Sequence, residues 1–213
     1  TASGSVSVST GQSSGESGSL RMVTGDSDEK SGDLVLLVGS SSDIGGGVFV
    51  SAGDGYSAGG DMNLTAGSSM FGYGGNLTIS SGASDAEEIV GGSVLLESAN
   101  SLVSGNLTMR TGNATLGNSG SLFVSTGAAL SGSAGNLTIR GGAGYNGGVG
   151  ANVVIAGGNG DLMGGDISLT GGGANMSDSG SVVVSSGYSV GGASGDVNIS
   201  TGDTELMGTG SIN

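Results

Sequence analysis

The chain contains no histidine, cysteine, proline or tryptophan, and only four of its 213 residues are basic. Without His and Cys it lacks the most common general base, the thiolate nucleophile and the usual ligands of zinc and copper. A catalytic site would have to rest on carboxylates, serines and the basic residues Arg21, Lys30, Arg110 and Arg140. The sequence therefore predicts a protein that is not an enzyme. The lack of cysteine also excludes a disulfide framework, and it leaves the redox compartment open.

Positive charge is scarce, since 18 acidic residues against four basic ones give a net charge of −14. Nucleic-acid binding needs a basic surface, and an anionic membrane surface also attracts basic segments. No apolar stretch approaches the roughly 20 residues that span a bilayer, and no signal peptide opens the chain. We therefore expect neither a nucleic-acid partner nor a membrane span.

Glycine is abundant, with 50 residues in the chain. A composition rich in Gly and Ser is typical of flexible linkers. Apolar residues nevertheless make up 35% of the chain, and its mean hydropathy is +0.17, whereas disordered segments are polar and strongly charged. These values favour a chain that contains ordered structure.

One motif recurs from end to end: a glycine, a small residue or Asp/Asn, alternating apolar and other residues, and a second glycine seven positions after the first. Examples are SGSVSVSTG from Ser3, GGNLTISSG from Gly74 and SGDVNISTG from Ser194. We call the two positions the first and the closing glycine; Ala151 replaces the first glycine of one repeat, and Ala99 replaces the closing glycine of another. The first-glycine positions are Gly4, Gly18, Gly32, Gly46, Gly60, Gly75, Gly92, Gly105, Gly120, Gly135, Ala151, Gly165, Gly180, Gly195 and Gly210.

Within each motif the second and fourth positions after the first glycine are apolar, as in Leu137 and Ile139. A period of two indicates an extended strand with one buried face, and glycine suits the corners at its ends. A loop of roughly eight residues follows each strand, and most loops carry one apolar residue that we expect to point inward. These loop residues are Tyr56, Met70, Leu102, Leu116, Leu130, Tyr145, Leu162, Met176, Val190 and Leu206.

Repeated short strands with glycine corners predict an all-β fold, a β-solenoid (β-helix) of about 14 tandem repeats of about 15 residues. We expect residues 1–213 to form a single solenoid domain. Neither end resembles a cap, which predicts a segment of a longer array or a unit that stacks end to end. An antiparallel meander or a propeller is the alternative fold.

The third position of the motif alternates between polar and apolar residues from Thr78 onward. This alternation favours two strands in each coil of about 30 residues. The apolar members would then line one outer face, and an exposed apolar column of this kind usually marks an interface. The predicted interface residues are Leu95, Phe123, Val154 and Val183. The alternative to an interface is that longer loops of the same chain cover these apolar residues.

Two kinds of polar site remain open. Asn-x-Ser/Thr sequons, possible N-glycosylation sites in a secreted protein, occur at Asn63, Asn76, Asn106, Asn113, Asn136, Asn175 and Asn198. Some of them are equally explained by repeat duplication. Acidic residues cluster at residues 26–29 and 85–88, which would suit calcium, although a solvated acidic surface is the simpler interpretation. We therefore predict no metal or cofactor site beyond this calcium alternative.

The Gly- and Ser-rich repeats resemble, in architecture, the β-solenoid repeat proteins of secreted fibres and adhesins. The resemblance implies an extracellular or cell-surface location. It also implies a non-enzymatic structural protein, the repeat segment of a filament, fibre or surface stalk, whose partner is another copy of itself, with glycans as a further possible partner. The alternative function is an adhesin or ice-binding module that uses one flat face, for which Thr78, Thr108, Thr138, Ser168 and Asn198 are the candidate array.

Overall fold

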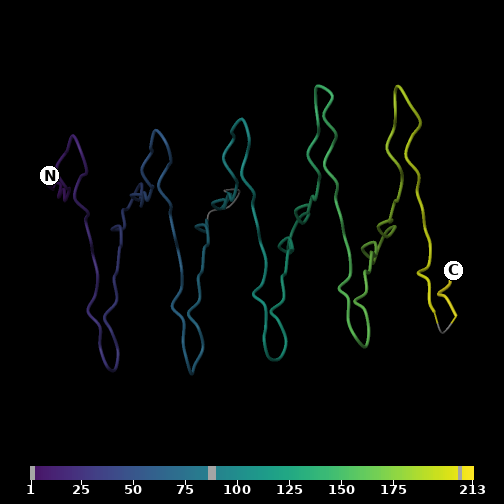
Figure 1. Ribbon diagram of the computed structural model, residues 1–213, viewed down its shortest axis with the longest axis horizontal. Helices are drawn as coiled ribbons and strands as arrows, with labels where there is room; N and C mark the ends of the chain where they lie inside the picture. The colour runs from purple at the N-terminus through teal and green to yellow at the C-terminus, as the bar shows by residue number, and fades with distance from the viewer. Residues whose placement is uncertain (1–2, 86–89, 206–207) are drawn as a thin grey trace. The chain divides into compact units, whose positions relative to one another are not determined.

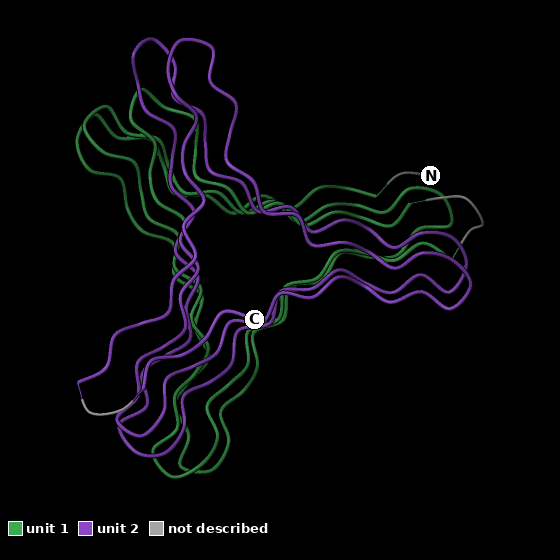
Figure 2. Cartoon of the chain, turned by 90° about the vertical axis from the view of Figure 1, so that its right-hand side faces the viewer, with its two compact units in different colours: residues 1–107 green, residues 108–213 purple. Residues whose placement is uncertain are grey.

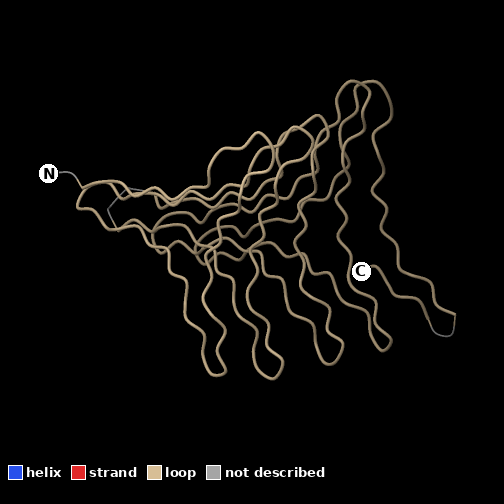
Figure 3. Cartoon of the chain, turned by 60° about the vertical axis from the view of Figure 1, so that its left-hand side comes forward, coloured by secondary structure: helices blue, strands red, loops and turns tan. Residues whose placement is uncertain are grey.

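The computed structural model describes residues 3–85, 90–205 and 208–213. These residues form no helix and no strand, and the chain is drawn throughout as loops and turns (Figure 3). The predicted all-β fold is therefore wrong, and with it the β-solenoid of about 14 repeats of about 15 residues and the coil of two strands over about 30 residues. Within the described ranges, no helix is long and apolar enough to cross a membrane.

The chain divides into two units, Thr1–Leu107 and Thr108–Asn213. In each unit, extended motif segments alternate with loops that leave and return to nearly the same point (Figure 1). Within either unit taken alone, these loops project in three directions (Figure 2). The repeat in the sequence therefore corresponds to a repeat of segment and loop.

Six loops close at their base through a backbone hydrogen bond, and we call this base the neck. At six necks, the backbone N–H of the first-glycine position donates a hydrogen bond to the carbonyl of the closing glycine of the preceding motif. The donor and acceptor pairs are Gly60 and Gly53, Gly75 and Gly67, Gly92 and Gly82, Ala151 and Gly142, Gly165 and Gly158, and Gly180 and Gly172, with distances of 2.8 or 2.9 Å. The two fixed glycines of the motif thus mark the two sides of each neck.

The necks are the most shielded part of the chain. No described residue is buried, and six are partly shielded from solvent. Five of these six occupy the position just before a closing glycine: Ala66, Thr111, Gly141, Gly171 and Thr201. The chain therefore packs best against itself where a loop closes, and its shielding is local to each repeat.

The location of the hydrogen bonds explains why the strand prediction fails. A strand requires a ladder of backbone bonds to a neighbouring extended segment. Among the described residues, the backbone bonds instead join the two sides of one neck or close a tight turn, as between Gly148 and Tyr145. Glycine corners return the chain to itself within a single repeat, so neighbouring motif segments are left without lateral partners.

Local hydrogen bonds shape the loops beyond the necks. In five repeats the ninth position after the first glycine is a serine whose Oγ accepts a bond from a backbone N–H two or three residues later; these are Ser13, Ser27, Ser41, Ser69 and Ser189. Such side-chain turns are typical of serine. In the second unit, positive φ angles occur at Gly117, Gly132, Asn146 and Gly147. These features reverse the chain at the loop tips.

The apolar loop residues do not point inward. Tyr56, Leu102, Leu130 and Met176 are fully exposed, and Tyr145 is 81% exposed. The expectation that these residues anchor the loops against a core is therefore wrong for the described part of the chain, which has no buried core. Leu206, the last of the predicted anchors, lies outside the described residues.

Candidate interaction surface

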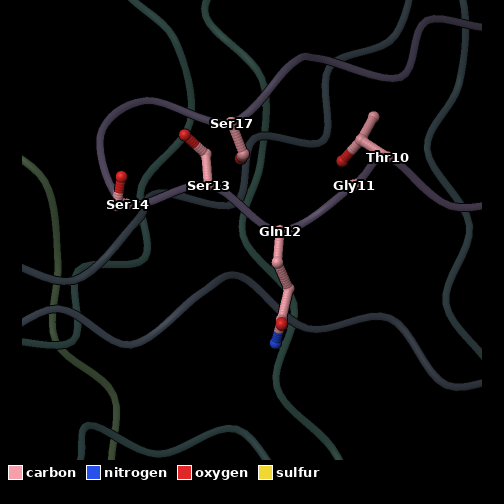
Figure 4. Close-up of a pocket in the computed structure, with 6 residues that line it drawn as sticks. All are labelled: Thr10, Gly11, Gln12, Ser13, Ser14 and Ser17. Atoms are coloured by element: carbon pink, nitrogen blue, oxygen red, sulfur yellow. The ribbon is translucent and has the colours of Figure 1, made fainter.

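The first loop contains a concavity with a volume of about 750 Å³ (Figure 4). It is lined by Thr10, Gly11, Gln12, Ser13, Ser14 and Ser17, all of which are uncharged. The Oγ of Ser13 already accepts a hydrogen bond from the backbone N–H of Gly15 at 3.1 Å. This lining offers hydroxyl and amide groups and no titratable group for acid–base chemistry.

The acidic clusters do not assemble a cation site in the described part of the chain. There, no group of three or more carboxylates lies close enough together to hold a metal ion. In the cluster at residues 26–29, the backbone N–H of Glu29 donates to the Oγ of Ser27 at 3.3 Å. Most of the second cluster, residues 86–88, lies outside the described residues.

The described residues leave their large apolar side chains in contact with solvent. The solvent-accessible surface is 21693 Å². A compact monomer of 19.9 kDa would expose about 8,700 Å², and a fully extended chain about 29,000 Å². The surface is thus closer to the extended value, because the motif segments do not cover one another. The apolar side chains of the motif are therefore available to partners outside the chain.

Each predicted interface residue is more exposed than the apolar residue on either side of it. Val154 is 83% exposed, against 53% for Val153 and 66% for Ile155. Phe123 in its segment is 88% exposed, against 58% and 60% for its two neighbours. Leu95 and Val183 are likewise more exposed than both of their sequence neighbours. An extended backbone directs successive side chains to opposite sides, which explains this alternation. Their role as an interface stays a prediction.

The seven sequon asparagines all lie at exposed positions. Asn113 and Asn175 lie in loops, while Asn63, Asn76, Asn106, Asn136 and Asn198 lie in motif segments. The structure brings no two of them into one described site, and they stay candidate acceptors. Sequence reasoning missed two features of these loops: the shielded position before the closing glycine and the turn serine. The serine could have been found in part, because several repeats carry it nine residues after the first glycine, as at Ser13 and Ser69.

The comparisons with known proteins do not assign the chain to a family. No protein-family model matches it, and no curated protein or solved structure is significantly similar to it.

Proposed function

We propose that the chain is a non-enzymatic structural protein that associates with further copies of itself in an extracellular assembly. The observation that carries the proposal is the regular exposure of apolar side chains in the motif segments, including Phe123 and Val154. Burial of apolar surface contributes about 25 cal/mol per Å², so a chain that leaves this area in water gains most by covering it. Large exposed apolar patches are typical of interaction surfaces.

Another copy of the chain is the partner that fits these segments best. The segments recur at intervals of 13 to 17 residues, so two copies can match over many segments at once. When several weak contacts are linked on one chain, the later ones form at a high effective concentration, and the total affinity exceeds that of any single contact. The motif backbone, which lacks lateral partners among the described residues, can add hydrogen bonds across the same contact.

An extracellular location is consistent with the exposed sequons, which glycosylation enzymes could reach without unfolding of the chain. The alternative function, a flat face that binds ice or another surface, would require paired strands that the described residues do not form. Self-association requires only the exposed motif segments. We therefore retain it as the proposed function.

The test compares two double variants that change the same motif position in alternate repeats. The first variant carries Phe123→Lys and Val154→Lys, and the matched control carries Thr108→Lys and Thr138→Lys. Both raise the net charge by the same amount, so they differ in the apolar area that is lost. Protein made without glycosylation is used, because the control also removes two sequons.

Sedimentation velocity over a range of concentrations, together with negative-stain images, measures the assembly. Burial of two such side chains contributes about 3 kcal/mol or more, so the first variant should need at least about a hundredfold higher concentration to assemble. The control should assemble as the unchanged chain does. A monodisperse unchanged chain at high concentration, or equal effects of the two variants, would contradict the proposal.

A further inference from the structure

Two Asn-Gly pairs lie in the second unit, at Asn146-Gly147 and Asn159-Gly160. All four residues are exposed, and each pair lies in a loop with a hydrogen-bonded neck. The sequence alone makes them equivalent, since glycine follows the asparagine in both. The backbone around the two pairs differs, and this difference predicts different chemistry.

The relevant chemistry is deamidation, in which asparagine reacts with its own backbone. The backbone nitrogen of the following residue attacks the side-chain Cγ and loses its proton, the bond from Cγ to the side-chain nitrogen breaks, and ammonia leaves. The resulting five-membered succinimide then takes up one water. Opening at Cγ gives aspartate, whereas opening at the main-chain carbonyl gives isoaspartate. A following glycine favours the attack, because it has no Cβ to obstruct it.

Asn146 is held in a conformation that opposes this attack. Its φ is 55° and that of Gly147 is 85°, and the N–H of Gly148 donates to the carbonyl of Tyr145 at 3.1 Å. Two central residues with positive φ and this bond define a type I′ turn. In such a turn, the Cβ of the first central residue and the next backbone nitrogen lie nearly opposite each other about the Cα–C bond. The ring can close only after the turn opens.

Asn159 has no such turn. Its φ is not positive, and no backbone hydrogen bond between described residues closes a turn across Asn159 and Gly160. The neck bond of its loop, from the N–H of Gly165 to the carbonyl of Gly158 at 2.8 Å, lies outside the pair. Among the described residues, no backbone hydrogen bond across the pair therefore has to break before the Cα–C bond of Asn159 rotates toward the geometry in which the Gly160 nitrogen reaches Cγ.

We propose that Asn159 is a site of spontaneous deamidation in the folded chain, and that the type I′ turn protects Asn146. The reaction replaces a neutral amide by a carboxylate, so the net charge changes from −14 to −15. The isoaspartate product also adds one carbon to the main chain inside the loop that Gly158 and Gly165 close. The modified loop thus differs from its neighbours in both charge and length.

The test follows both sites in the same molecule. The full chain is kept in neutral buffer, and peptide mapping by mass spectrometry with electron-transfer fragmentation measures aspartate and isoaspartate at each site. Asn159 should react about fivefold faster than Asn146, the factor that corresponds to one net hydrogen bond of about 1 kcal/mol. In denaturant the two rates should become equal, because both asparagines precede glycine.

A variant provides the second arm. Gly148→Pro removes the N–H that closes the type I′ turn, so Asn146 should then react about as fast as Asn159. Equal rates in the folded chain, slower reaction at Asn159, or no reaction at either site would overturn the proposal. A difference that persists in denaturant would also overturn it, because the turn would then not be its cause.

Discussion

The substitution Gly171→Ala tests whether the necks hold the loops closed. Gly171 precedes the closing glycine of its motif and is one of the partly shielded residues. A Cβ built on Gly171 would collide with the carbonyl oxygen of Gly180, which lies across the neck. Because the obstructing oxygen and carbon of the Gly180 carbonyl belong to the backbone, the collision can be relieved only if the two sides of the neck move apart. The 2.8 Å bond from the Gly180 N–H to the Gly172 carbonyl should then be lost.

The expected increase in the exchange rate of the Gly180 amide follows from the loss of one exposed hydrogen bond. Such a bond contributes about 1 kcal/mol net, which corresponds to a closed neck favoured about fivefold over an open one. The amide of Gly180 should therefore exchange with solvent about fivefold faster in Gly171→Ala. Alanine also restricts the unfolded chain, by about 0.4–1 kcal/mol, so global stability is a poorer measure of the neck than this amide.

Amide hydrogen exchange followed by NMR at Gly180 is the assay. The matched control is Gly173→Ala in the same loop, because a Cβ on Gly173 would meet no atom within 4 Å. The control should leave the exchange rate of Gly180 unchanged. The reasoning is refuted if the two variants change that rate equally, or if Gly171→Ala leaves it unaffected.

Two further predictions concern charge and the loop turns. Raising the salt concentration from about 0.01 M to about 0.15 M shortens the Debye length from about 30 Å to about 8 Å, which weakens the repulsion between chains of net charge −14. Sedimentation velocity should therefore show stronger association at the higher salt concentration. Weaker association would contradict the proposed self-assembly. Ser69→Ala removes the Oγ that accepts a 2.8 Å bond from the Gly72 N–H, and should speed exchange of that amide about fivefold, while Ser68→Ala should not.

The repeat and the positions of its glycine corners could be predicted from the sequence. The first and closing glycines lie where the necks form, as between Gly60 and Gly53. The order of exposure within a segment could also be predicted, since Phe123 and Val154 exceed their neighbours. Both features depend on local geometry, namely the corners that glycine permits and the alternation of an extended backbone. Local geometry is what a sequence pattern describes best.

Pairing between segments could not be predicted in the same way. The alternation at Leu137 and Ile139 predicts an extended conformation, but it contains no information on whether another segment approaches within hydrogen-bonding distance. The prediction that Tyr56 and Leu130 point inward failed for a related reason. A constant offset shows that they share a place in the loop, whereas their direction depends on where the loop closes. The neck between Gly53 and Gly60, for example, closes near the motif segments and leaves Tyr56 exposed in the loop beyond it.

The neck bonds also bear on how the chain tolerates changes of length. The interval from Gly53 to Gly60 is shorter than that from Gly82 to Gly92, yet the N···O distance is 2.9 Å in both necks. Closing a longer flexible loop costs little, about 0.6 kcal/mol for each doubling of its length. A residue gained or lost beyond a neck therefore need not alter the segments on either side. Insertions and deletions in the loops can accumulate during evolution while the spacing of glycines within each motif stays at seven.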